Sequence, residues 1–313
     1  MEQGGIFMLG SYDWISILLL AASLLTGNTP VEQTNPSEIQ QETQAVPSVT
    51  QAVTPTPEQP ELIYDPVPTP EQPTENSASV GAYDEKEWWF RRNSDHLPPS
   101  AQSEIAIGQY DAYYLGDTQH KVVYLTFDEG YENGYTAQIL DILKEHNIKA
   151  AFFVTTPYIE SEPELVQRMV DEGHIVGNHS TTHPRMSTLS DAQIQTELQE
   201  CADAFQALTG QEMPKYFRPP SGVYSIHSLE QTQAAGYKTI FWSFAYADWD
   251  PDNQPGKQAA FDMVKDYTHN GCILLLHAVS QSNTEALSDM IEYLQAQGYV
   301  FQTLDDLPPA NTI

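Results

Sequence analysis

The stretch Lys121–Tyr135, "KVVYLTFDEGYENGY", decides the fold. Its first seven residues are apolar, β-branched or aromatic almost throughout, which predicts a buried strand. Two carboxylates, Asp128 and Glu129, follow where this strand stops and a glycine-containing loop begins. Such a pair either caps the following helix or holds a cation and moves a proton. Both interpretations stay open at this point.

Strand-like and helix-like segments alternate from this stretch to about residue 307. Six further strands are predicted within "AAFFVTT", "HIVGN", "KYFRPP", "KTIFWSF", "GCILLLH" and "GYVFQTL", and the segments between them have apolar residues at helical spacing. Seven strands alternating with helices predict an α/β protein with a parallel sheet. Because no dinucleotide-binding glycine pattern is present, we expect a closed or nearly closed (β/α) barrel; an open doubly wound sheet is the alternative.

The chain before the predicted barrel differs in composition. Residues 27–83 are rich in Pro, Thr, Gln, Glu and Ser, which predicts an extended, disordered linker ahead of a catalytic domain spanning 84–313. Within residues 1–26, "WISILLLAASLL" has the length of a signal-peptide core, although no Lys or Arg precedes Lys86. We therefore expect a signal peptide or membrane anchor and an exported protein at the cell wall or membrane; a chance apolar patch is the alternative.

The charge balance restricts the possible partners, and the cysteine count indicates whether a disulfide is present. The chain has 13 Lys and Arg against 43 Asp and Glu, for a net charge of −30. This balance argues against nucleic acid as a partner, since phosphate contacts need a basic face. Two cysteines, Cys201 and Cys272, lie in a predicted helix and a predicted strand, so two buried free thiols are expected rather than a disulfide.

Polar residues recur where the predicted strands end. In a (β/α) barrel these ends meet at one face, where catalytic groups gather. Two His with a carboxylate can bind a divalent cation and leave positions for water and substrate, and an Arg beside a carboxylate keeps it ionised. The pattern indicates a metal-assisted hydrolase. The residues in question are Asp128, Glu129, His179, His183, Arg218, Asp248 and His277.

Five short motifs, "TFDEG", "HSTTH", "RPPSG", "ADW" and "LLLH", resemble in order those of the polysaccharide deacetylases with a NodB-type domain, carbohydrate esterase family four. Longer matches such as "TFDEGYENGYT" and "FWSFAYADW" are similar to the delta-lactam-biosynthetic de-N-acetylases. That subgroup acts on N-acetylmuramic acid in peptidoglycan, and its product leads to the muramic lactam of the spore cortex. The resemblance implies a distorted seven-stranded barrel and peptidoglycan glycan strands as the partner.

The resemblance also implies roles for individual residues. It makes Asp128 the general base, His277 the general acid, and Arg218 the brace of Asp128. The metal would be divalent, zinc first, with magnesium, manganese or cobalt as alternatives. Its ligands would be His179, His183 and Glu129. The Ser221 backbone N–H would donate to the oxyanion, and Trp249 and Leu275 would form the acetyl pocket. Separately from the resemblance, we expect Arg185 to bind the lactyl carboxylate, because the chain has few cations and this one lies beside the metal loop.

Two departures from the family pattern limit these expectations. Glu129 stands where the broad family has a metal-binding Asp, and Ala245 stands where its fourth motif has an acid, which leaves Asp248 as the nearby partner for His277. Two other functions therefore stay open: a deacetylase of N-acetylglucosamine in peptidoglycan or chitin, and a wall-binding module with a decayed site.

Overall fold

The computed structural model describes residues 81–101 and 103–310. The predicted leader lies outside this part, as does the predicted linker except for its last three residues. Those three pack onto the domain: the carbonyl of the buried Ala82 accepts a hydrogen bond from the His227 N–H, and the Tyr83 ring lies 4.3 Å from the His227 ring. Ala82 and Tyr83 thus contact the domain that is predicted to begin at residue 84. No helix in the described residues is long and apolar enough to cross a membrane.

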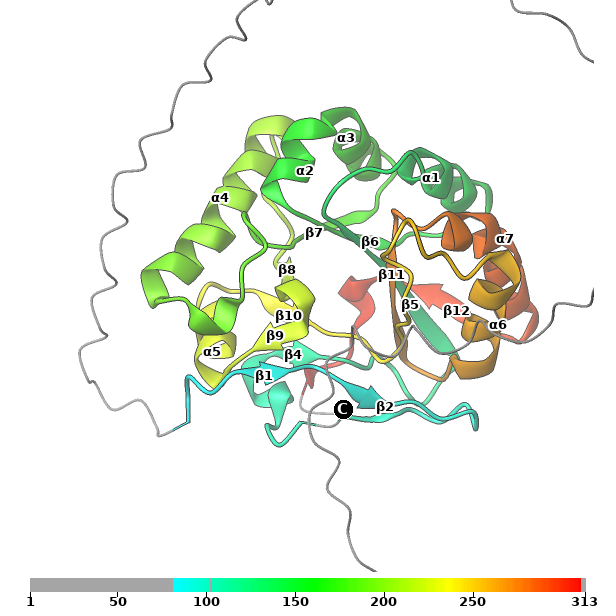
Figure 1. Cartoon of the computed structure of the whole chain (residues 1–313), viewed down its shortest axis with the longest axis horizontal. Coiled ribbons are helices and arrows are strands. Elements are labelled where there is room, and N and C mark those ends of the chain that lie inside the picture. Colours follow the sequence, from blue (N-terminus) through cyan, green and yellow to red (C-terminus); the bar gives the residue numbers. More distant parts are fainter. Residues whose placement is uncertain (1–80, 102, 311–313) are drawn as a thin grey trace, which may run out of the picture. The chain divides into compact units, whose positions relative to one another are not determined.

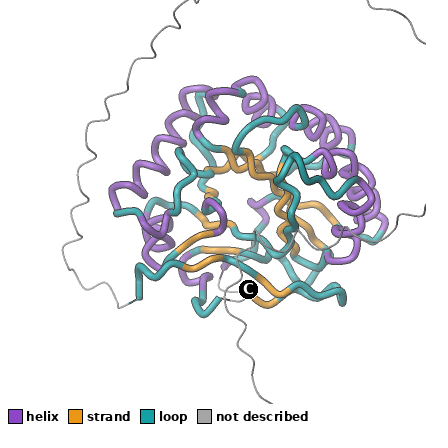
Figure 2. Tube along the Cα trace, viewed as in Figure 1, coloured by secondary structure: helices purple, strands orange, loops and turns teal. Residues whose placement is uncertain are grey.

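One parallel sheet curls around the centre of the domain, with helices outside it (Figures 1 and 2). Its strands run in the order β11-β5-β6-β7-β8-β10-β4, and β12 pairs with the first half of β5. The predicted distorted (β/α) barrel is therefore confirmed, as a curled half-barrel. The strands are β4 (Ala112–Tyr113), β5 (Val122–Glu129), β6 (Ala151–Val154), β7 (Ile175–Asn178), β8 (Tyr216–Phe217), β10 (Lys238–Ile240), β11 (Cys272–His277) and β12 (Val300–Gln302).

The seven predicted strands are all present in this sheet, and β4 is a further strand of the same sheet that was not predicted from the sequence. The helices are α1 (Thr136–Glu145), α2 (Thr156–Ser161), α3 (Pro163–Asp171), α4 (Asp191–Thr209), α5 (Ile226–Ala234), α6 (Lys257–Tyr267) and α7 (Gln281–Ala296), with 3-10 turns η1 (Ile107–Tyr110), η2 (Met186–Thr188), η3 (Pro220–Gly222) and η4 (Leu304–Asp306). The longest helix, α4, is capped by Ser190 and closed by Gly210 in the left-handed conformation, and both residue types are favoured at those helix ends.

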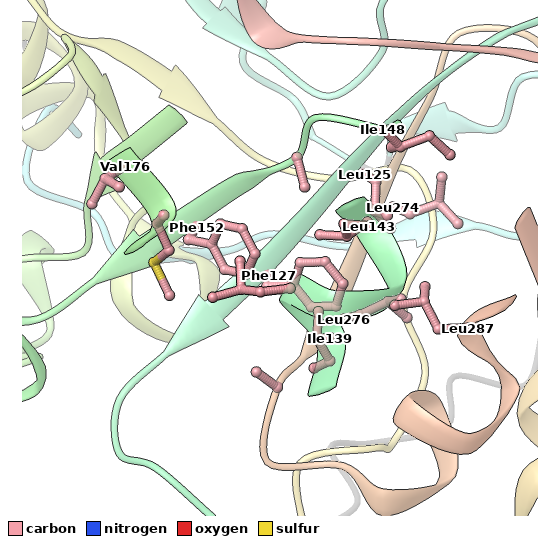
Figure 3. Packing of buried hydrophobic residues seen from close by; sticks show 14 of the residues in the cluster. Leu125, Phe127, Ile139, Leu143, Ile148, Phe152, Val176, Leu274, Leu276 and Leu287 are labelled. Atoms are coloured by element: carbon pink, nitrogen blue, oxygen red, sulfur yellow. The ribbon is translucent and has the colours of Figure 1, made fainter. Parts of the chain in front are cut away.

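Strand alternation divides the core into two layers. On β5, Val123, Leu125 and Phe127 face outward and pack under the helices with residues of α1, β11 and α7 (Figure 3). Val122 and Tyr124 face the other way, into the barrel, with Phe153 and Ile240. Residue parity therefore decides whether a side chain of β5 lies inside the barrel or under the helices. Cys201 and Cys272 are buried and free, as predicted.

An N-terminal segment lies across one side of the barrel (Figure 1). Its strand β1 (Lys86–Glu87) pairs antiparallel with β9 (Val223–Tyr224), and β2 (Phe90–Arg91) pairs antiparallel with β3 (Ser100–Ala101). The β1–β9 pair ties the segment to the chain that follows β8, whereas the β2–β3 pair lies within the segment itself.

Candidate active site

Asp128 lies at the end of β5 on the inner face and is held by a buried arginine. Its Oδ1 accepts a hydrogen bond of 2.7 Å from Nη1 of Arg218, a residue without solvent exposure. The Arg218 guanidinium also donates to the Ile240 carbonyl and lies 4.3 Å from the Phe153 ring. Burial would raise the pKa of Asp128, but the positive charge of Arg218 outweighs it and holds that pKa below its ordinary value. Asp128 is therefore a carboxylate with one oxygen fixed.

Glu129 points to the opposite face of β5, which corrects the expectation that it holds a metal with the two His. Its side chain is fully buried under the helices, where Thr136 Oγ1 donates to its Oε1 over 3.5 Å and Oε2 has no hydrogen-bond partner. Burial, followed by repulsion from Glu132 and Asp128, raises the pKa of Glu129 well above its ordinary value. Consecutive residues of a strand cannot face the same way, so the two carboxylates do not share a site.

The two imidazoles of "HSTTH" lie together beside Asp128. Their ring centroids are 4.9 Å apart, and Nε2 of His179 lies 3.7 Å from Oδ2 of Asp128. The Nδ1–H of His179 donates to the Arg218 carbonyl over 2.8 Å, so the Nε2 lone pair faces the carboxylate. Burial lowers the pKa of His179 to about 4, which keeps this imidazole neutral and able to bind a cation.

The loop between these two His is shaped by a residue that the sequence reading missed. Glu197 of α4 accepts hydrogen bonds from the backbone N–H groups of Thr181 and Thr182, at 2.9 and 2.8 Å, and from the Thr182 hydroxyl at 2.7 Å. His183 adopts a left-handed backbone conformation with φ of 56°, as the loop closes before Pro184. No local sequence signal marks Glu197, because its partners lie about 15 positions away along the chain.

His277 ends β11 and pairs with Asp248, as expected from the lack of an acid at Ala245. Nδ1 of His277 donates to Oδ1 of Asp248 over 2.8 Å, and the His277 backbone N–H donates to Oδ2 over 2.9 Å. The Asn283 amide also donates to Oδ2. Burial would lower the pKa of His277, but Asp248 outweighs it and raises that pKa above 6.5. This imidazole is biased toward its protonated form.

Three of the predicted substrate-binding residues flank these groups. Leu275 is two residues before His277 on the same face of β11 and is buried. Trp249 is 55% exposed, with its ring 5.9 Å from the His277 ring. Ser221 has φ of 54°, and Gly222 beside it has φ of 67°, where a Cβ would lie 2.7 Å from the Trp242 ring. The turn that carries the Ser221 N–H therefore requires this glycine.

Arg185, the expected anchor for a carboxylate, is engaged elsewhere. Its guanidinium donates to Glu85 over 2.6 and 3.0 Å and lies 3.5 Å from Glu87. Both acids belong to the N-terminal segment, whose contact with Arg185 could not be read from the local sequence. With two carboxylates already around it, Arg185 links two loops and is a poor anchor for the charge of a substrate.

The donor groups fit a cation held by two imidazoles. Among the described residues no three His, Cys, Asp or Glu side chains are arranged as a ready metal site. The His179 ring nevertheless has the outer contact typical of a metal-binding His, a bond from its second nitrogen to a backbone carbonyl. Neutral His179 and the neighbouring His183 would supply nitrogen ligands to such a cation, and Asp128 would supply an adjacent negative charge.

Comparison with known proteins agrees with this geometry. Residues 115–240 match the family model for polysaccharide deacetylases. The peptidoglycan-N-acetylmuramic acid deacetylase PdaA of Bacillus subtilis strain 168 is 48% identical over 222 residues, which cover 70% of this chain and 84% of that protein.

Two solved structures have the same fold. The structure of Bacillus subtilis PdaA, a family 4 carbohydrate esterase, matches with a TM-score of 0.70 at 46% identity, covering 72% of this chain and 97% of that one. A family 4 carbohydrate esterase from Bacillus anthracis matches with a TM-score of 0.61 at 40% identity, covering 74% and 100%. This chain belongs to the polysaccharide deacetylase family, the NodB-type family 4 carbohydrate esterases, and is a hydrolase of that family.

Proposed function

We propose that this protein hydrolyses the N-acetyl group of N-acetylmuramic acid in peptidoglycan and releases acetate. The similarity to PdaA supports this substrate, because it extends over 84% of that enzyme's length. Peptidoglycan glycan strands would be the partner, and the amine formed on muramic acid would lead to the delta-lactam of the spore cortex. A protein that acts on the wall would lie outside the cytoplasm, either exported or tethered to the membrane through residues 1–26.

The observation that carries the proposal is that Asp128 and His277 lie side by side and that their pKa values are shifted in opposite directions. Asp128 and His277 are directly paired Cα positions on the parallel strands β5 and β11. Arg218 lowers the pKa of Asp128 against the effect of burial, whereas Asp248 raises the pKa of His277 against the same effect. At one pH, therefore, the carboxylate can accept a proton while the imidazolium can donate one.

The reaction follows from these positions. Oδ2 of Asp128, the oxygen not held by Arg218, takes a proton from a water molecule. The oxygen of that water bonds to the acetamide carbonyl carbon at the same time. The bond from that carbon to nitrogen then breaks, and Nε2–H of His277 protonates the departing amine. His277 keeps its orientation because Asp248 binds its Nδ1–H. The products are acetate and the free amino sugar.

The remaining side chains would bind and orient the substrate. The Ser221 N–H would donate to the developing oxyanion, and Leu275 with Trp249 would enclose the acetyl methyl. His179 and His183 would hold a divalent cation, with zinc favoured by imidazole ligands, and such a cation supplies Lewis-acid polarisation of the acetamide.

Product analysis on defined glycans tests the proposal. Peptidoglycan strands with and without stem peptides, and chitooligosaccharides, are incubated with the full chain, and acetate and product masses are measured. We expect acetate release with the mass loss on muramic acid residues, abolished by a chelator and restored by zinc. Mass loss on N-acetylglucosamine alone would replace the muramic assignment with the glucosamine alternative. No acetate from any glycan, with or without added metal, would indicate a decayed site.

A further inference from the structure

The N-terminal segment, residues 81–101, contacts three loops of the active site, although it lies outside residues 115–240 that match the family model. Glu85 accepts hydrogen bonds from Arg185 and from Ser187, just after the imidazole pair. Trp88 bonds to the turn after Arg218, and Arg92 bonds to the loop before Asp248. A segment that joins three such loops can set their relative positions.

Trp88 fixes this segment in place. Its backbone N–H donates to the Gly222 carbonyl over 2.8 Å, and its indole Nε1–H donates to the Trp242 carbonyl over 2.9 Å. The ring is buried and lies 4.6 Å from that of Phe241. Because two hydrogen bonds and a ring contact hold Trp88, the position of the chain that follows it is restrained relative to the barrel.

Arg92 follows four residues later and bonds to the loop that supplies Asp248. Its Nη2 donates to the Ala245 carbonyl over 2.7 Å, and its guanidinium lies 4.8 Å from the ring of Tyr267. This is a charge-assisted hydrogen bond, the stronger class of such bonds. It restrains the backbone three residues before Asp248.

The same loop is held from the barrel side at its other positions. The Phe244 carbonyl accepts from the Leu275 N–H over 2.9 Å, and the Tyr246 hydroxyl bonds to Asn283. Asn283 in turn donates to Asp248. The methyl side chain of Ala245 forms no hydrogen bond, so the restraint at that position comes from Arg92, which binds the Ala245 carbonyl from outside the barrel.

We propose that Arg92 is a positioning residue for the deacetylase reaction: it holds loop 244–248 so that Asp248 meets His277. This role rests on the proposed function for its kinetic consequence, since Asp248 orients the acid that protonates the leaving amine. Arg92 acts through the loop and touches neither substrate nor reacting atoms.

The test compares Arg92→Ala with Arg91→Ala, which removes the same charge one residue earlier, where the structure records no ion pair or hydrogen bond to the side chain. Misplacing a catalytic group by about 1 Å can cost about 10²-fold in rate. We expect kcat on an N-acetylated glycan to fall about tenfold in Arg92→Ala with KM nearly unchanged, and Arg91→Ala to match wild type. Arg92→Lys should recover part of the loss.

Hydrogen–deuterium exchange of the full-length variants gives a second readout that does not depend on activity. Faster exchange of the amides of residues 245–249 is expected in Arg92→Ala alone, at an unchanged melting temperature. Wild-type kcat in Arg92→Ala, a rise confined to KM, or equal exchange in both alanine variants would overturn the role. If wild type releases no acetate, the proposed function fails, and exchange at residues 245–249 still decides whether Arg92 holds the loop.

Discussion

The two faces of β5 treat neighbouring carboxylates in opposite ways. On the inner face, Asp128 has Arg218 on one oxygen and His179 near the other, and its pKa is lowered. On the outer face, Glu129 has a long bond from Thr136, an unpartnered oxygen and a strongly raised pKa. Burial raises the pKa of both groups, so the direction of each net shift depends on whether a positive side chain lies beside the carboxylate. Arg218 does so for Asp128, and no positive side chain among the described residues does so for Glu129.

This difference suits Asp128 to proton transfer and leaves Glu129 with a structural role. A general base has to be ionised at the working pH, which the inner face secures and the outer face opposes. A raised pKa is often taken to mark a functional site, but Glu129 owes its shift to burial under helices, away from the imidazoles. Substitutions on the two faces test this division, and the largest effect is expected at Asp128.

Exchanging each acid for its amide gives the sharpest contrast. Asp128→Asn should lower kcat by about 10² to 10⁴-fold, the usual contribution of a general base. Glu129→Gln keeps shape and hydrogen-bonding capacity on the outer face, so we expect activity within about threefold of wild type, since no acid–base contribution is lost. Acetate release by both variants measures this, and comparable losses in the two would break the comparison between the faces.

Removal of His277, the proposed general acid on strand β11, should also lower kcat, but less than the Asp128 substitution does. His277→Ala is expected to reduce kcat by at least about 10²-fold, because the leaving amine loses its proton donor. His120→Ala, which alters an exposed His paired only with Asp117, serves as the control. Near-wild-type turnover in His277→Ala would reject the assigned acid.

The loop that presents the imidazoles on the inner face should depend on Glu197. Loss of such an outer contact typically weakens metal binding by about 10- to 100-fold, and we expect Glu197→Ala to weaken zinc binding by about tenfold. Glu200→Ala on the same helix is the matched control, because no hydrogen bond or ion pair of its side chain is recorded. Zinc titration by calorimetry checks this; equal affinities in the two variants would remove Glu197 from the site.

The smallest effect concerns stability and pH on the outer face. The folded-state pKa of Glu129 is raised, so its contribution is fully present below the unfolded value, 4.5, and is lost as pH rises through the folded value. Glu129→Gln removes this loss, so its melting temperature relative to wild type should increase between pH 4.5 and 8. A constant difference across that range would mean that Glu129 is not buried as the structure indicates.

Local sequence patterns predicted the elements whose signals are long or repeated. The seven strands and the convergence of Asp128, His179, Arg218 and His277 follow from apolar runs that end in polar residues. The ends of α4 follow instead from its capping residues, Ser190 and Gly210. Strand β4 was missed because it has two residues, too few for any periodicity. Helix α2 was missed because its six residues are too few to show helical periodicity.

Two site residues were misplaced for different reasons. Applying strand alternation to Asp128 and Glu129 would have put them on opposite faces, so that signal was present in the sequence. The pairing of Arg185 with Glu85 joins residues 100 positions apart, and nothing local indicates it. The same holds for Arg92 and Ala245, 153 positions apart. Contacts of this kind depend on tertiary structure and could not be predicted from the sequence pattern.

The most direct test of the central claim is the pH dependence of kcat/KM on glycan strands, measured for wild type and Asp248→Asn. The account predicts a plateau that begins in the acid range, because Asp128 ionises below its ordinary value of 3.8, and a falling limb above pH 6.5 as His277 loses its proton. In Asp248→Asn the falling limb should move to lower pH. A falling limb at the same pH in both proteins would contradict His277 as the acid that Asp248 holds protonated.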